Sequence, residues 1–153
     1  MDEKERQARY CFGCGSLNPH GLQLSFRLEE GRATAEFTPQ AEHQGFPGYM
    51  HGGLVMTMMD EAMGWVTIGQ KVWAVTAKVN VRFREPVPLS QPVIVSAAIE
   101  KNRRRWLTVR AEVRSREGEI LAEAEGIFMR VSGERQRQLD EIYLPVYNRD
   151  GKF

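Results

Sequence analysis

The sequence has few of the features that are typical of disulfide-rich, zinc-ribbon, nucleic-acid-binding or membrane-surface proteins. Its 153 residues include only two cysteines and three histidines. This count excludes a disulfide framework and does not supply the paired cysteine motifs of a zinc ribbon. The formal charge of +1 is far from the basic excess that favours nucleic acid or an anionic membrane surface, so we expect neither partner.

A long hydrophobic run is also missing. The opening segment, MDEKERQARY, is charged from its second residue, so no signal peptide is expected there. The most apolar stretch, residues 54–68, is too short and too interrupted to span a membrane. The hydrophobic fraction of 42% and the charged fraction of 27% are ordinary for a globular chain. We therefore expect one cytoplasmic domain with a substantial core.

The most informative stretch is residues 45–69, GFPGYMHGGLVMTMMDEAMGWVTIG. Its glycines and proline predict a loop, followed by a helix that begins between His51 and Leu54 and ends at Gly69. Apolar side chains cover most of the helix circumference, which predicts burial on nearly all sides. One narrow stripe of small or polar residues recurs at the spacing of a single helix face: Gly53, Thr57, Asp60, Gly64 and Thr67.

Asp60 is the best candidate for chemistry on this stripe. A carboxylate in a mostly apolar helix has to be paired, hydrated or used in a reaction, because unpaired burial of charge is costly. Periodicity alone favours a catalytic role and a structural salt bridge or cap equally. Glu61 lies about 100° further round the helix, so the two acids are predicted to serve different purposes.

The start of the helix offers a second feature, because His51 is followed by Gly52 and Gly53. Two glycines there let a ligand approach backbone N–H groups at the positive end of the helix dipole, which suits a developing oxyanion. An ordinary glycine-permitted turn is the alternative.

Alternating apolar and polar residues predict six strands around this helix. The expected ranges are 22–28 and 33–37, joined by a Glu30-Gly31 turn, then 75–84, 93–100, 106–115 and 120–131. In the range 75–84, the apolar odd-numbered residues should share one face. The order β-β-α-β-β-β-β predicts an α+β domain in which a largely antiparallel sheet of about six strands curls around one long helix.

This pattern divides the chain into three parts. Residues 1–20 are predicted to form an N-terminal extension with a CxxC turn, and residues 21–131 the α+β domain. Residues 132–153 are predicted to form a polar tail with a helical turn around residues 135–142.

The CFGCG segment holds both cysteines, Cys11 and Cys14. We expect a reduced, non-catalytic structural turn, because a second cysteine pair and the βαβ context of a redox motif are missing. A metal ion is the alternative, with His20 as third ligand or with two such segments meeting across a dimer. The chemistry proposed for the helix requires no metal.

The helix and the strand after it resemble those of hotdog-fold acyl-CoA thioesterases, the group that includes the phenylacetate-pathway thioesterase and mammalian thioesterase superfamily members. The most specific segment is HGGLVMTMMDEAMG, with Asp60 nine residues after His51. TAKVNVRFREPVPL resembles the following strand, and CFGCG with NPHGL recurs in a subset of relatives. The resemblance covers roughly residues 11–131. It implies the hotdog fold, hydrolysis of an acyl-CoA to free acid and CoA without a cofactor, and a homodimer or dimer of dimers with active sites between subunits.

Position by position, the resemblance makes Asp60 a general base or nucleophile. It assigns the oxyanion site to the amides around Gly52 and Gly53, with His51 fixing that turn. Thr76 occupies a strand position where some relatives place a hydroxyl that the partner subunit contributes.

Substrate-binding candidates lie outside this group. Many relatives have an Asn or Gln before His-Gly-Gly, and Gln44 is the nearest residue of that type here. Met59 belongs to a methionine-rich stretch that would form an adaptable wall for an acyl chain. The only basic run, residues 103–105 (Arg103, Arg104 and Arg105), is commonly a solvated turn, but it would also suit the phosphates of CoA.

Two other functions remain as alternatives. Hotdog dehydratases share the Phe-Pro-Gly sequence of residues 46–48, but they carry a catalytic His immediately before it, where Gly45 stands in this chain. A non-catalytic acyl-CoA-binding regulator would keep the pocket without needing Asp60.

Overall fold

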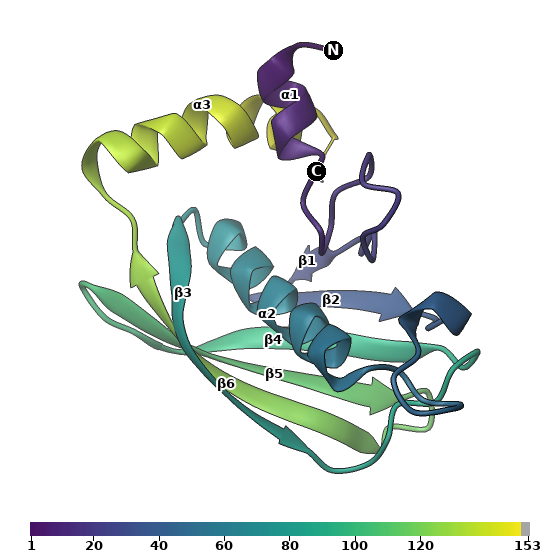
Figure 1. Ribbon diagram of the computed structural model, residues 1–153. Coiled ribbons are helices and arrows are strands. Elements are labelled where there is room, and N and C mark those ends of the chain that lie inside the picture. The colour runs from purple at the N-terminus through teal and green to yellow at the C-terminus, as the bar shows by residue number, and fades with distance from the viewer. Residues whose placement is uncertain (151–153) are drawn as a thin grey trace.

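The computed structural model describes residues 1–150. Its helices are α1 (Glu3–Ala8), α2 (Gly52–Gly69) and α3 (Gly133–Asp150), with a short 3₁₀ helix η1 (Ala41–His43). Its strands are β1 (Arg27–Glu29), β2 (Arg32–Phe37), β3 (Ala74–Phe83), β4 (Val93–Asn102), β5 (Trp106–Ser115) and β6 (Ile120–Arg130). The strands form one antiparallel sheet in the order β1-β2-β4-β5-β6-β3, which curves around α2 (Figure 1). The predicted α+β architecture is confirmed.

Helix α2 begins and ends where the sequence indicates. His51 is its N-cap, with extended backbone angles (φ −61°, ψ 132°) and a side chain that accepts a hydrogen bond from the Gly53 N–H. Met58, Met59, Ala62 and Met63 have no exposed surface. Burial around most of the circumference explains why the helix carries so few polar residues. Within the described residues, no helix has the length and apolarity to cross a membrane.

The sheet approaches α2 closely because of a glycine in β6. A Cβ at Gly126 would lie 2.7 Å from the ring of Phe128 and 2.9 Å from the sulfur of Met63. A side chain there would push the helix away from the sheet, so the small residue sets the distance between the two layers.

The first hairpin is shorter than the sequence predicts. Leu22, Leu24 and Phe26 are buried, but they are not part of a strand. Gln23 has φ of 50°, which interrupts the extended run. The N–H groups of Leu22 and Leu24 donate to the carbonyls of Phe12 and Gly13, so this segment lines the CFGCG turn instead of pairing with β2.

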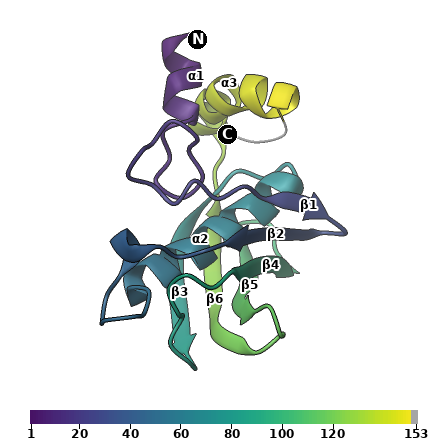
Figure 2. The same cartoon turned by 90° about the vertical axis from the view of Figure 1, so that its right-hand side faces the viewer.

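The segment predicted as a polar tail with a helical turn around residues 135–142 is helical over a longer range than expected. Helix α3 has 18 residues and packs against α1 (Figure 2). Lys4 pairs with Glu141 at 2.8 Å, and Val146 is buried. Exposed ion pairs of this kind contribute little, so apolar contacts hold α3 in place. The last part of the predicted tail, residues 151–153, lies outside the described residues.

Strand β3 lies at one end of the sheet, with β6 as its only neighbour among the described strands. Its register with β6 contains a bulge between Thr76 and Lys78. The bulge disrupts the simple alternation predicted for residues 75–84. Val75 and Phe83 are 43% and 54% exposed, so β3 presents apolar side chains to solvent at the edge of the sheet.

Candidate active site

Asp60 lies near the middle of α2 and is half-buried. Its Oδ1 accepts a hydrogen bond of 2.8 Å from the hydroxyl of Thr76 on β3. The resemblance to thioesterases implies that this threonine comes from a partner subunit. In the described chain the hydroxyl reaches the carboxylate within one subunit, and the bond holds one carboxylate oxygen in a fixed direction.

The bulge in β3 explains how Thr76 reaches Asp60. Thr76 is opposite Phe128, which is buried on the helix side of the sheet, and Val79 is opposite Gly126 on that same side. Regular alternation would put Thr76 and Val79 on opposite faces, as the sequence analysis assumed. The extra residue, Ala77, shifts the alternation by one position. Residues before it in β3 therefore lie on the opposite face of the sheet from the one that regular alternation gives. Bulges commonly redirect a side chain beside a functional site, and this one turns the Thr76 hydroxyl toward α2.

The stripe of small residues on α2 is accessible along only part of its length. Thr57 donates to the Gly53 carbonyl at 2.9 Å, and Thr67 donates to the Gly64 carbonyl at 2.8 Å. Both hydroxyls therefore satisfy the backbone of the helix. Thr67 is only 1% exposed, whereas a Cβ at Gly64 would meet nothing within 4 Å. A ligand could approach the helix between Gly53 and Gly64, with Asp60 inside that interval.

The helix start differs from the expectation in one respect. The Gly53 N–H donates to Nδ1 of His51 at 2.9 Å, so it is not available to an oxyanion in this conformation. The exposed Gly52 N–H has no acceptor among the described residues. A Cβ at Gly52 would lie 3.5 Å from the ring of Phe83, which places this amide beside β3. The predicted oxyanion site is thus reduced to one free donor, Gly52.

Two substrate-binding candidates have other contacts in the structure. The Gln44 side chain accepts from the Gly48 N–H at 3.0 Å and closes the loop before α2. No hydrogen bond within the described residues joins Gln44 to Asp60. Met59 is fully buried in the core, because it lies on the side of α2 that packs against the sheet. It therefore does not line an open surface of the chain.

The arginines at residues 103–105 lie in the exposed turn between β4 and β5. Elsewhere, arginines on the sheet pair with carboxylates: Arg84 with Glu123 at 2.9 Å, and Arg110 with Glu100 at 3.0 Å. Within the described part of the chain, none of the three turn arginines forms such a pair. Their guanidinium groups are free to bind an anion.

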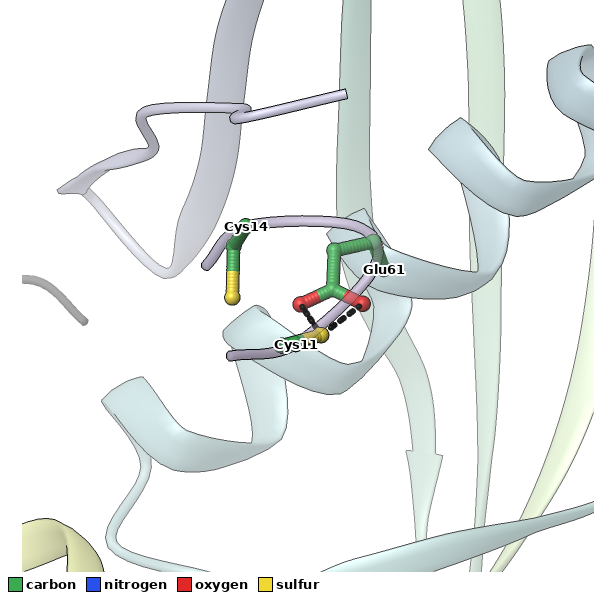
Figure 3. Close-up of side chains that lie close together, drawn as sticks. All are labelled: Cys11, Cys14 and Glu61. Carbon is green, nitrogen blue, oxygen red and sulfur yellow. Dashed lines mark hydrogen bonds between the residues drawn. The ribbon is translucent and has the colours of Figure 1, made fainter. Parts of the chain in front are cut away.

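The Glu61 side chain meets the CFGCG turn (Figure 3). Both of its carboxylate oxygens lie 3.6 Å from the sulfur of Cys11. Burial, with a smaller contribution from Cys11, raises the Glu61 pKa to about 7. The hydrogen bond between the two sulfur groups lowers the pKa of Cys11 to about 5 and raises that of Cys14. The sequence does not predict this cluster, because Glu61 is 50 residues from Cys11 and no local pattern links them.

Comparisons with known proteins agree with this architecture. The family model described as "Thioesterase superfamily" matches residues 47–122. Acyl-coenzyme A thioesterase THEM4 of Bos taurus is 35% identical over 108 residues, which are 70% of this chain and 44% of that protein. The chain spans about half the length of such curated relatives.

Two solved structures illustrate the structural similarity. A mutant of the phenylacetic acid degradation protein PaaI from Thermus thermophilus is 27% identical, with a TM-score of 0.66, over 72% of this chain and 95% of that one. A Streptococcus mutans protein solved with bound acetyl CoA shares the fold at 18% identity, with a TM-score of 0.68, over 71% of this chain and 89% of that one. The family match over residues 47–122, the relatives and the shared architecture together show a thioesterase superfamily domain with the hotdog fold.

Proposed function

We propose that this protein hydrolyses acyl-CoA thioesters to a free acid and CoA, with Asp60 as the reacting carboxylate. The observation that carries the proposal is the Asp60–Thr76 hydrogen bond at 2.8 Å, on the accessible part of the α2 stripe. The THEM4 relatives are named acyl-coenzyme A thioesterases, and a protein of the same fold binds acetyl CoA. Both support CoA esters as the substrate class.

The reaction needs a nucleophile and a donor for the oxyanion. Asp60 either takes a proton from a water that attacks the thioester carbonyl or attacks that carbon itself to give an anhydride that water then opens. In both routes the C–S bond breaks, CoA leaves as the thiol, and the acyl group becomes a carboxylic acid. Gly52 and Asp60 of one chain are eight residues, or about 12 Å, apart along α2, so the donor for a carbonyl at one Asp60 would be the partner subunit's Gly52 N–H. A positioned base contributes about 10²- to 10⁴-fold, and one oxyanion donor about 10²- to 10³-fold.

We also infer that residues 103–105 bind the phosphates of CoA. The three guanidinium groups are exposed and unpaired within the described chain, and Arg suits phosphate through charge-assisted, paired hydrogen bonds. Arg130 links this turn to β3, because its N–H donates to the Arg105 carbonyl and it lies opposite Ala74. The turn is therefore at the same end of the sheet as Thr76.

We propose that the working unit is a homodimer that covers the exposed edge of β3. Unpaired strand edges and large apolar side chains in water favour association. Val75, Phe83 and Met129 on the sheet, and Met56 on α2, are all at least 40% exposed. A partner strand along β3 would also lie close to Asp60, which contacts Thr76 on β3.

Light scattering after size exclusion is expected to give twice the chain mass, or four times that mass if dimers pair again. A monomer at micromolar concentration would contradict both the dimer and a site enclosed between subunits. Phe83→Lys places a charge on the exposed apolar edge and should increase the monomer fraction. Leu144→Lys, at an exposed position on α3, is the matched control and should not.

The Thr76 hydroxyl is expected to orient Asp60. Thr76→Val keeps the shape of the side chain but removes the donor, and loss of a hydrogen bond to a charged group costs about 1.5–3 kcal/mol, so kcat should fall about 10- to 100-fold. Thr76→Ser restores the hydroxyl and should recover most of the activity. Equal activity in the Val and Ser variants would show that the hydrogen bond has no part in turnover.

A hydrolysis screen tests the proposed function itself. The chain is incubated with acyl-CoA esters of short, medium and long aliphatic acids and of aromatic acids, and released CoA is measured. We expect turnover with at least one acyl class. Tight binding of acyl-CoA without release of CoA from any of them would instead support the non-catalytic regulator.

A further inference from the structure

A second cluster of reactive groups lies on a different side of α2 from the Thr76 contact. Cys11, Cys14 and Glu61 each offer one ligand atom, and these atoms all lie within 4.8 Å of one another. Cys14 is buried, and the other two residues are half-buried. Figure 3 shows the two sulfur atoms and the carboxylate directed toward a common point.

The turn is folded around the Glu61 side chain. A Cβ at Gly13 would lie 2.4 Å from a carboxylate oxygen of Glu61, so only glycine lets the backbone pass over this group. The Gly15 N–H donates to the Cys11 carbonyl at 2.9 Å, and the carbonyls of Phe12 and Gly13 accept from Leu22 and Leu24. These backbone bonds hold both cysteines in position independently of the groups that meet at the centre.

The cluster brings together three groups that become negative and no positive one. Within the described residues, Glu61 makes no ion pair with a Lys, Arg or His side chain. Buried groups of like charge are costly unless a cation offsets them. From the convergence of two thiols and a carboxylate around one point, we propose that Cys11, Cys14 and Glu61 bind a thiophilic divalent cation, Zn²⁺ by preference.

The ligand types suit zinc, and the chain would fill three of its four positions. Zinc in proteins takes Cys sulfur at about 2.3 Å and carboxylate oxygen at about 2.0–2.2 Å in a tetrahedral arrangement. Ligand atoms around one such ion are then about 3.5–4 Å apart, and the Cys11 sulfur lies 3.6 Å from each Glu61 oxygen. Thiolates select against Mg²⁺ and Ca²⁺, which prefer oxygen ligands. His20, the third ligand considered from the sequence, is not in the cluster.

The proposed site would join the N-terminal extension to the helix that carries Asp60. Without the ion, the contacts between the CFGCG turn and Glu61 are two long S–H···O interactions and packing. With the ion, the turn would be bonded to α2 one residue from the reacting carboxylate. The role is structural, because Glu61 and Asp60 point to different sides of the helix.

The test uses the full chain, purified under reducing conditions without chelators. Elemental analysis is expected to find one Zn²⁺ per chain. After removal of that metal, Co²⁺ should bind with a sulfur-to-cobalt charge-transfer band, which reports thiolate ligands directly. Zn²⁺ should then displace it with a dissociation constant below about 1 μM. Glu61→Gln and Cys14→Ser should each weaken metal binding by about 100-fold or more, since even groups behind the direct ligands contribute about 10- to 100-fold.

Glu117→Gln, at an exposed turn between β5 and β6, is the matched control and should bind metal like the parent protein. The proposal is wrong if the reduced parent shows no charge-transfer band with Co²⁺. It is also wrong if Glu61→Gln binds zinc as tightly as the parent, because the carboxylate is then not a ligand. Purification of the chain only as a Cys11–Cys14 disulfide that binds no zinc after reduction would point to a redox pair instead.

Discussion

Asp60→Asn is expected to lower kcat by about 10²-fold or more with little change in KM. The substitution keeps the size of the side chain and a hydrogen-bonding oxygen for Thr76, whose hydroxyl lies 2.8 Å from Oδ1. It removes the negative charge that has to accept a proton or attack the carbonyl. Because the substrate would still bind, the loss should appear in the chemical step, as measured by steady-state CoA release from the best substrate of the screen.

The control for this variant is Glu117→Gln, which makes the same chemical change at an exposed turn and should leave kcat unchanged. Circular dichroism and light scattering establish that each variant is folded and assembled as the parent is. Full activity of Asp60→Asn would show that the Asp60 carboxylate does not take part in the reaction. Loss of turnover in Glu61→Gln with an active Asp60→Asn would instead place the reacting group on the other side of α2.

The central helix could be predicted because its signals are local. A loop rich in glycine and proline, followed by an apolar run that ends at Gly69, defines its bounds, and the structure places α2 at Gly52–Gly69. The number of strands and their order along the chain were also predictable, because turn residues separate the runs of strand-forming residues. The bounds of the helix and of the strands depend on residues that are close together in the sequence, so they can be predicted from local patterns.

The parts that the sequence did not predict depend on contacts between distant segments. Helix α3 is polar on average, as a solvated tail would be, but its Val146 is buried in the core. Leu22 and Leu24 alternate as in a strand, yet their N–H groups pair with the CFGCG turn. In both cases tertiary contacts overrode the local pattern.

The candidate site shows the same division. Asp60 was identified from helix periodicity together with the resemblance, and the structure places it on the accessible stripe. The direction of the Thr76 side chain could not be derived, because a bulge at Ala77 has no mark in the sequence and reverses the alternation. The hydrogen bond from the Gly53 N–H to the His51 side chain could not be predicted either. The sequence left the first residue of the helix open between His51 and Leu54.

That capping bond makes Gly52 the residue on which the oxyanion proposal depends, and the geometry allows its N–H to be removed alone. Gly52 is the first residue of α2, and its N–H has no acceptor among the described residues. Proline is well tolerated at this helix position, because the N–H is unused and φ is already helical. Proline also requires an extended residue before it, and His51 has φ −61° and ψ 132°. Gly52→Pro should therefore fold normally.

With the amide removed, we expect kcat to fall by about 10²- to 10³-fold, the usual cost of losing one oxyanion donor. Gly52→Ala is the matched comparison. It keeps the N–H, and its Cβ would lie 3.5 Å from the Phe83 ring, which is ordinary contact, so its loss should be much smaller. Steady-state kinetics of both variants, with thermal unfolding to compare their stability, separate the donor from the backbone change. Equal activities of the proline and alanine variants would show that the thioester oxygen is bound elsewhere, and the Gly52 amide would then have no part in the reaction.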